Sequence, residues 1–552
     1  MKNKYIPFLS LMILFFSCNQ LDTRVDLQQT WDDITANRNR AFDLGYTPYG
    51  YLRNEFYYID GNIDAALSDE AEQTASTSQT QLFNNGSWNA VSNPDNVYES
   101  DYRGIRAATF FLNYTIDYKD LLSKGRDTIS LEGKRAYDKE VIDMKWLRAE
   151  AQVLRAYFYF DLIKRYGGVP LITQVFAEGE DADIERSSYD EIVNYIVTEI
   201  DAVKDSLVLD WEDVDVARDG RLTKGAALAL KSRALLYAAS PLNNPSNDIK
   251  KWEAAAIAAN NVIELSKYWF SQNYQNLFLE GNSATENEII FSIRGGMTNT
   301  PEKLNYPIGT PGGASGITPS HNLVEAYEYK GSPDPLDPYK NRDPRLAYTV
   351  VTNNSWWNDR MIDISPGGID DANKPNTSKT GYYLKKFLTP NLNLLRDERK
   401  LHNWVVFRFA ETFLNYAEAM NEAYGPDDNQ GNWLSAREAV NYIRNRNGVQ
   451  MPPVIATTKE EMRARIKHER RIELAFESHR HWDLLRWKDA ETVLNAPIKG
   501  VKAIKENTYK YEEFVVEDRK FDASKMYLYP IPQVEINKSK LLSGKLEQNP
   551  GW

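Results

Sequence analysis

The sequence predicts a mainly α-helical protein: a scaffold of paired helices, a loop-rich irregular face and few short strands. Two observations carry this prediction. Apolar residues recur at steps of three and four in several segments of the 552-residue chain, which is the period of an amphipathic helix. Between these segments lies a long stretch rich in glycine and proline, residues that interrupt regular structure and favour turns.

The N-terminus is typical of a lipoprotein signal peptide. Lys2 and Lys4 precede an apolar stretch over residues 6–16, and Ser17 and Cys18 follow it. Cys18 is the only cysteine of the chain, and it stands where such a peptide places its acylated residue. We therefore expect residues 1–17 to be removed and Cys18 to carry lipid, which anchors the mature protein to a membrane. The alternative is a chance cysteine at the end of an ordinary signal peptide. No later segment approaches the roughly 20 apolar residues of a spanning helix.

Four helices are predicted in the first half of the chain. The first covers Met144 to Tyr166 and ends at the Gly167-Gly168 pair. The second, from Tyr189 to Leu207, begins with a capping box in which Ser188 is followed three residues later by Glu191. The other two are expected over 223–240, before a proline, and over 252–267.

The region between Gly281 and Asn403 has a different character. It contains one predicted strand, Ile289 to Ile293, and then long loops rich in glycine and proline. Long ordered loops in a compact protein are usually functional. Aromatic residues within these loops, among them Trp356 and Trp357, favour an ordered structure.

Helical periodicity returns in the last third, over 405–424, 436–447 and 458–487. In the last of these segments Arg465, Glu469, Glu473 and Glu477 lie at steps of four, which predicts ion pairs that clamp the helix to its neighbours. Taken together, the helices fall into consecutive pairs, as in tetratricopeptide-like helical hairpins. The strict repeat spacing is absent, so an irregular helical bundle is the alternative.

Charge and motif content exclude several classes of function. The formal net charge of −12 disfavours nucleic acid as a partner, because an acidic surface repels phosphate backbones. There is no His-Glu-x-x-His metal motif, no Gly-x-Ser-x-Gly elbow and no phosphate-binding glycine loop. The densest set of acids is the arginine-paired row, where lowered pKa values disfavour a proton donor. We therefore expect no enzymatic activity, no cofactor and no metal site.

Several short motifs together resemble the SusD/RagB family of outer-membrane nutrient-binding lipoproteins. They are, in order, Arg148–Ala151, Tyr166–Leu171, Arg221–Ala227, Arg342–Leu346, Leu414–Ala419, Glu469–Leu474, Tyr529–Pro532 and Gln548–Trp552. The resemblance covers nearly the whole chain. It divides the mature protein into an N-terminal helical region, 18–280, and a C-terminal region, 281–552, packed together as one body.

The resemblance also implies a function and a partner. It implies a lipid-anchored protein on the outer membrane, facing the cell exterior, that binds a glycan without cleaving it. The glycan would be delivered to a SusC-type TonB-dependent transporter, over which such a protein sits as a lid. Two alternatives stay open: capture of peptides by the same kind of complex, and a tetratricopeptide-type scaffold for protein interactions.

Two loop clusters have the composition of a sugar-binding surface. Aromatic rings stack on the apolar faces of sugars, while Asn, Asp and Arg side chains hydrogen-bond their hydroxyls. A tryptophan among polar loop residues is also poorly explained as part of the core. The candidate ligand-binding residues are Asn85, Trp88 and Asn89 in the first cluster, and Trp356, Trp357 and Arg360 in the second. The alternative is that each tryptophan pins its loop to the body.

Overall fold

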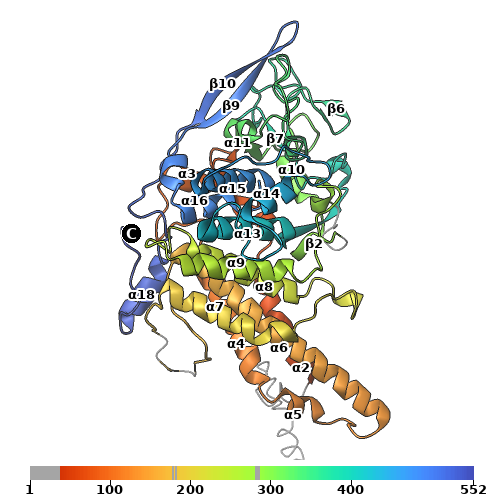
Figure 1. Cartoon of the computed structure of the whole chain (residues 1–552), viewed down its shortest axis with the longest axis vertical. Coiled ribbons are helices and arrows are strands. Elements are labelled where there is room, and N and C mark those ends of the chain that lie inside the picture. Colours follow the sequence, from red (N-terminus) through yellow and green to blue (C-terminus); the bar gives the residue numbers. More distant parts are fainter. Residues whose placement is uncertain (1–37, 177–178, 181–182, 280–285) are drawn as a thin grey trace, which may run out of the picture.

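A computed structural model describes residues 38–176, 179–180, 183–279 and 286–552 (Figure 1). It has 44% helix and 11% strand, which confirms the predicted mainly α-helical class. The predicted signal peptide and Cys18 lie outside the described residues. None of the helices within the described ranges is long and apolar enough to cross a membrane.

The scaffold is a stack of helices, most of which pack against the scaffold helices that come before and after them in the sequence. Its members are α4 (Tyr98–Tyr114), α6 (Leu131–Tyr166), α7 (Tyr189–Val203), α8 (Lys224–Ala239), α9 (Ile249–Ile263), α13 (Phe409–Tyr424), α14 (Ala436–Arg444), α15 (Lys459–Glu473) and α16 (Arg480–Trp487). The first part of α6 extends away from the body with α5 (Tyr118–Ser123), at the bottom of Figure 1.

The helix ends follow the signals in the sequence. The Ser188 side chain accepts a hydrogen bond from the Glu191 N–H, and the Glu191 carboxylate accepts one from the Ser188 N–H, so the predicted capping box is confirmed. At the other end of α6, Gly167 has a φ of 70°, a left-handed conformation that favours glycine. Thr223 caps α8 by accepting a hydrogen bond from the Ala226 N–H.

Several predicted helical boundaries are wrong. Helix α6 begins at Leu131 and not at Met144. Helix α13 starts only at Phe409, because residues 400–408 form strand β8, which pairs antiparallel with β2 (Ile289–Thr298). β8 is almost entirely buried on both faces, so its short apolar run has no alternation that separates it from a helix. The segment 458–487 is likewise two helices, since Phe476 and Ser478 between α15 and α16 have φ values of 65° and 57°.

The loop-rich region is held by small antiparallel sheets of two strands each. Besides β2 and β8, the pairs are β1 (Ala71–Gln73) with β3 (Ile317–Pro319), β4 (Val350–Val351) with β7 (Tyr383–Leu384), β5 (Trp356–Trp357) with β6 (Arg360–Met361), and β9 (Ile498–Lys505) with β10 (Tyr509–Glu517). Short helices connect these pieces: α2 (Arg38–Tyr46), α3 (Thr80–Asn84), α10 (Thr300–Asn305), α11 (His321–Ala326), α12 (Arg345–Thr349), α17 (Ala490–Val493) and α18 (Gln533–Leu541). The β9–β10 hairpin projects from the body at the top of Figure 1.

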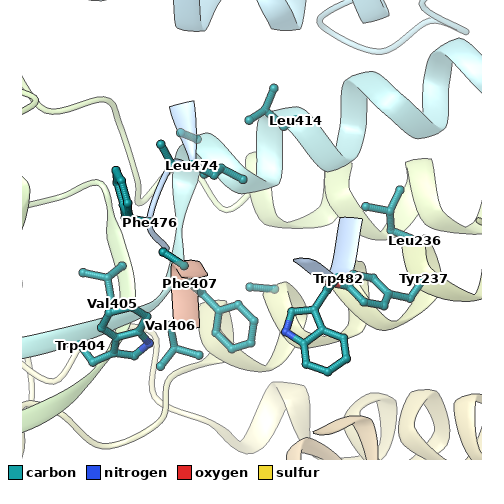
Figure 2. Close-up of a cluster of buried hydrophobic side chains, with 14 of the residues drawn as sticks. Leu236, Tyr237, Trp404, Val405, Val406, Phe407, Leu414, Leu474, Phe476 and Trp482 are labelled. Carbon is teal, nitrogen blue, oxygen red and sulfur yellow. The ribbon is translucent and has the colours of Figure 1, made fainter. Parts of the chain in front are cut away.

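One large hydrophobic core spans residues from Phe56 to Ile536 and so includes both halves of the chain. Figure 2 shows a part of it, where side chains of α8, β8, α13 and α16 meet. Leu236 and Tyr237 come from α8, Trp404 to Phe407 from β8, Leu414 from α13 and Trp482 from α16. The burial of these large side chains is the main stabilising contribution to the fold.

A buried ion-pair network fixes α15 to the elements around it. The carboxylate of Glu473, which is fully buried, accepts from Arg345 at 2.8 Å, Arg408 at 2.7 Å and Arg446 at 2.9 Å. Glu477, just after the helix, pairs with Arg408 at 2.6 Å. Burial alone acts to raise the pKa of Glu473, but the three guanidinium groups outweigh it and hold the pKa at about 2.

The predicted ion pairing of this carboxylate row is thus confirmed, and its partners come from other elements. Glu469 pairs with Arg345 at 2.5 Å and with Arg444 at 2.8 Å. Arg465 pairs with Glu328 at 2.8 Å instead of with its own helix. These ion pairs therefore clamp α15 to elements that are distant in the sequence, as predicted from the spacing of the charged residues.

The N-terminal segment is tied to the last third of the chain. Asp69 accepts hydrogen bonds from Arg471 and Arg480, which lie 402 and 411 residues away in the sequence. Arg519 donates to Glu72 at 2.9 Å. These contacts close the loop-rich side of the fold around the helices that carry its core.

Candidate glycan-binding surface

The second predicted cluster forms a tight β-hairpin, β5–β6, at the right of Figure 1. Asn358 and Asp359 make the turn with φ values of 51° and 57°. Two consecutive left-handed residues are the geometry of a type I′ turn, which Asn and Asp tolerate well. The local sequence therefore selects this turn, and the pairing of Trp357 with Arg360 sets the register.

The inner face of the hairpin anchors it to the body. Trp357 is 4% exposed, and its ring meets that of Tyr306 edge-on at 6.1 Å. Arg360 donates two hydrogen bonds, at 2.5 and 2.7 Å, to the two carboxylate oxygens of the fully buried Asp370. Asp370 in turn accepts from the Gly309 N–H at 3.0 Å. A bidentate pair of this kind fixes orientation as well as position.

The outer face presents the other side chains of the two strands. Trp356 is 64% exposed, and Met361, which stands opposite it, is 45% exposed. The turn itself is held from outside by Asn391, whose N–H donates to the Asn358 side chain at 2.8 Å. Trp356 is thus a flat apolar ring on a rigid support, on the same hairpin as the amide of Asn358 and the carboxylate of Asp359. This combination can stack on a sugar ring and hydrogen-bond its hydroxyls.

Lys385 is a second cation beside the inner face of the hairpin. Its ammonium lies 5.5 Å from the centroid of the Trp357 ring, and burial lowers the pKa of Lys385. Arg360 is neutralised by Asp370, so it contributes positioning more than free positive charge. Arg360 is therefore placed to hold the hairpin rather than to reach outward.

The structure places Trp88 in the core, so the argument that its polar neighbours leave it unburied is wrong. Trp88 is only 3% exposed. Its ring stacks on Phe83 at 4.6 Å and packs against Tyr529 at 4.8 Å and Trp552 at 4.5 Å. Asn85 and Asn89, beside it in the sequence, are exposed, and the ring is buried by Phe83 of the same loop region and by Tyr529 and Trp552 near the C-terminus. In this position its ring faces are covered by protein.

Asn85 and Asn89 are exposed and shape the turns of their loop. The Asn85 side chain accepts from the Ser87 N–H at 2.9 Å, and the Asn89 side chain from the Val91 N–H at 2.9 Å. This loop follows α3, at the left of Figure 1, whereas β6 lies at the right. The structure therefore does not bring the two predicted clusters into one site.

Sequence reasoning missed the partners that orient the hairpin. The sequence does not predict the exposed Met361, the buried Asp370 that pairs with Arg360, or Asn391 at the turn. The sequence does contain a signal for the hairpin itself, because an Asn-Asp pair between Trp-Trp and Arg-Met is a typical hairpin turn. The pairing of Arg360 with Asp370 has no such local signal. Across the described parts of the chain, no group of three or more metal-ligating side chains is found.

Comparison with known proteins agrees with this architecture. Residues 287–552 match the SusD family, and residues 20–236 match a family described as "Starch-binding associating with outer membrane". The chain belongs to the SusD/RagB family, as the resemblance in its motifs predicts. Proteins of this family are non-catalytic binding proteins, and the chain is one of them.

Individual relatives are similar at modest identity. SusD-like protein P38 of Formosa agariphila is 27% identical over 374 residues, which are 64% of this chain and 68% of that protein. A SusD-like protein of Bacteroides fragilis has a crystal structure that matches with a TM-score of 0.76 and 25% identity, over 94% of this chain and 98% of the other. A second B. fragilis structure, described as a SusD-like carbohydrate binding protein, matches with a TM-score of 0.74 and 26% identity, over 91% of this chain and 98% of the other.

Proposed function

We propose that this protein captures a glycan at the outside surface of a Gram-negative cell and delivers it, without cleavage, to a SusC-type TonB-dependent transporter. The observation that carries the proposal is the exposed Trp356 ring on a hairpin whose inner face is locked by Arg360 and Asp370. A rigid aromatic platform binds with little loss of conformational freedom. Support for a carbohydrate ligand comes from the 26%-identical structure described as carbohydrate binding.

The proposal includes the membrane anchor. Cys18 would carry the lipid that holds the protein on the outer membrane with its loop-rich face accessible from outside. The match to a family associated with the outer membrane supports this location. Mass spectrometry of the protein purified from membranes should show Cys18 acylated at the new N-terminus. An unmodified thiol would refute the anchor and leave the binding proposal to be decided separately.

The binding test is isothermal titration of the mature protein, in detergent, against plant, algal, host-mucosal and N-linked glycans, with a peptide mixture alongside. We expect saturable binding to one glycan class without product formation. Trp356→Ala should weaken that binding by about tenfold, corresponding to ~1.4 kcal/mol of stacking, and leave the melting temperature nearly unchanged. Binding of peptides alone would select the peptide-capture alternative, and turnover of the glycan would refute the non-catalytic assignment.

The transporter partner needs its own experiment. Purification of the protein from its native membrane under mild detergent should retain a TonB-dependent transporter in a stable complex. Its absence from both the native complex and a chemically crosslinked sample would refute delivery, even if glycan binding is confirmed.

A further inference from the structure

A second group of exposed aromatic side chains lies on the helical scaffold, and none of its residues belongs to the loops around β5–β6. We call it the α9–α14 aromatic surface and define it by Trp269, Trp433 and Tyr442. Their exposed fractions are 53%, 60% and 46%. Trp269 follows α9, Trp433 precedes α14 and Tyr442 lies within α14. Three segments thus converge to expose three large rings at one place.

Buried rings beneath hold this surface in position. Tyr442 packs on Phe270 at 5.5 Å and on Phe413 at 5.4 Å, and both of these phenylalanines are buried. Trp433 meets Tyr442 nearly edge-on, with ring centroids 5.4 Å apart and an interplanar angle of 71°. The support is therefore as rigid as the core, while the outer rings remain open to a ligand.

Two hollows adjoin these rings. One, of about 420 Å³, is lined by all three aromatic residues together with Asn260 and Glu264. The other, of about 810 Å³, is lined by Trp269 and Tyr442 with amide side chains. Those amides are Gln272, Asn441, Asn445 and Asn447. Trp269 and Tyr442 border both hollows, so a ligand that fills one can continue into the other across aromatic rings.

The polar atoms of the three aromatic side chains are free to bind a ligand. Among the described residues, no protein group accepts a hydrogen bond from the indole N–H of Trp269 or Trp433. None forms a hydrogen bond with the hydroxyl of Tyr442 either. Some of the amides already bond within the protein, since Asn441 accepts from the Val454 N–H at 2.7 Å and Asn447 donates to Gln272. Exposed aromatic rings that gather in one place usually mark a binding surface. Rings alternating with amide groups match a molecule with apolar faces and a rim of hydroxyls, which is a saccharide.

The charges around the hollows select among saccharides. Glu264 and Glu438 contribute negative charge. The only cation among the lining residues of the two hollows is Arg446, whose guanidinium is taken up by Glu288 at 2.5 Å and Glu473 at 2.9 Å. No free positive charge is therefore available for a sulfate or carboxylate group, and an acidic glycan would be repelled.

We propose that the α9–α14 aromatic surface is a second saccharide-binding site, which takes a neutral glycan. This proposal rests on the proposed function for the class of ligand. The location of the site and its preference for neutral sugars rest on the geometry and charges of the α9–α14 aromatic surface. A long glycan that touches both this surface and Trp356 would bind more tightly than to either alone, because the second contact is intramolecular.

The test combines footprinting with matched variants of the full-length mature protein. Oxidation of individual tryptophans is measured by mass spectrometry with and without laminarin, amylopectin or galactomannan as neutral probes, and with alginate as an acidic one. The variants are the double change Trp269→Ala and Trp433→Ala, the single change Trp356→Ala, and Ile129→Ala as a control at a residue 93% exposed on a distant loop.

We expect a neutral probe to protect Trp269 and Trp433 from oxidation, and alginate to protect neither. The double variant should weaken binding of that polysaccharide by about tenfold or more, whereas Ile129→Ala leaves it unchanged. Protection of Trp356 alone, with full affinity in the double variant, would refute the second site and leave the proposed function intact. If no glycan protects any tryptophan, both proposals fail. Loss of transporter co-purification in the double variant, without any change in glycan binding, would make this surface a protein interface and refute the inference.

Discussion

Replacement of Trp88 by alanine tests whether its ring belongs to the core or to a ligand surface. In the structure this ring is 3% exposed and contacts Phe83, Tyr529 and Trp552. Removing a buried tryptophan costs the transfer free energy of the ring and leaves a cavity, about 3–5 kcal/mol in total. We therefore expect the free energy of unfolding to fall by this amount.

The corresponding change in melting temperature follows from the size of the protein. Unfolding entropy is about 2.1 cal/mol/K per residue, so a cooperative unit of roughly 500 residues has ~1 kcal/mol/K and should lose about 3–5 °C. Differential scanning calorimetry measures the shift, and urea unfolding gives the free energy directly. Trp88→Phe, which keeps most of the stacking on Phe83, should recover about half of the loss.

Trp356→Ala is the matched control, because this tryptophan is 64% exposed and its loss should change stability by no more than about 0.5 kcal/mol. A Trp88→Ala variant that kept the wild-type melting temperature and lost glycan binding would contradict the burial of this ring. That result would place the Trp88 ring on the ligand surface and not among the C-terminal aromatic residues.

Two further predictions concern buried charges. Glu473→Gln removes the anion shared by Arg345, Arg408 and Arg446, and should lower the free energy of unfolding in urea by about 3–5 kcal/mol. The control Glu460→Gln, at an exposed position of the same helix, should leave this free energy almost unchanged. Equal losses of unfolding free energy in the two variants would contradict the stabilising role of the Glu473 ion pairs. Burial raises the pKa of the Glu70 carboxyl from 4.5 to about 8, so the folded protein holds a proton that the unfolded chain releases. Its contribution to stability is complete below pH 4.5 and is lost as the pH rises through about 8. Glu70→Gln should therefore flatten the decrease in melting temperature between about pH 5 and 8, and an unchanged slope would exclude this carboxyl as its source.

The sequence predicts those parts of the fold that depend on local pattern. The 3.6-residue period places α6, α7 and α8, and Ser188 and Gly167 mark helix ends because capping is a local interaction. The apolar pattern wrongly predicts helix for residues 405–408 of strand β8, because a short run buried on both faces has no diagnostic period. The β9–β10 hairpin was not predicted.

The candidate site shows the same division. The β5–β6 hairpin could be found from Trp356 and its neighbours, because the turn and the pairing are local. Trp88 could not be assigned correctly, because two of the rings that bury it, Tyr529 and Trp552, lie more than 400 residues away in the sequence. The aromatic surface formed by Trp269 and Trp433 is hidden for the same reason, since its parts belong to separate segments.

The ties between the two ends of the chain also determine when the protein can fold. Asp69 is almost fully buried, and its two guanidinium partners are made 402 and 411 residues later. Closing so long a loop is slow and cannot begin until those arginines exist, so these ion pairs form only late in the synthesis of the chain. Folding of this part of the protein can therefore finish only when nearly the whole chain is present, which agrees with the proposed export of the protein before it reaches the outer membrane.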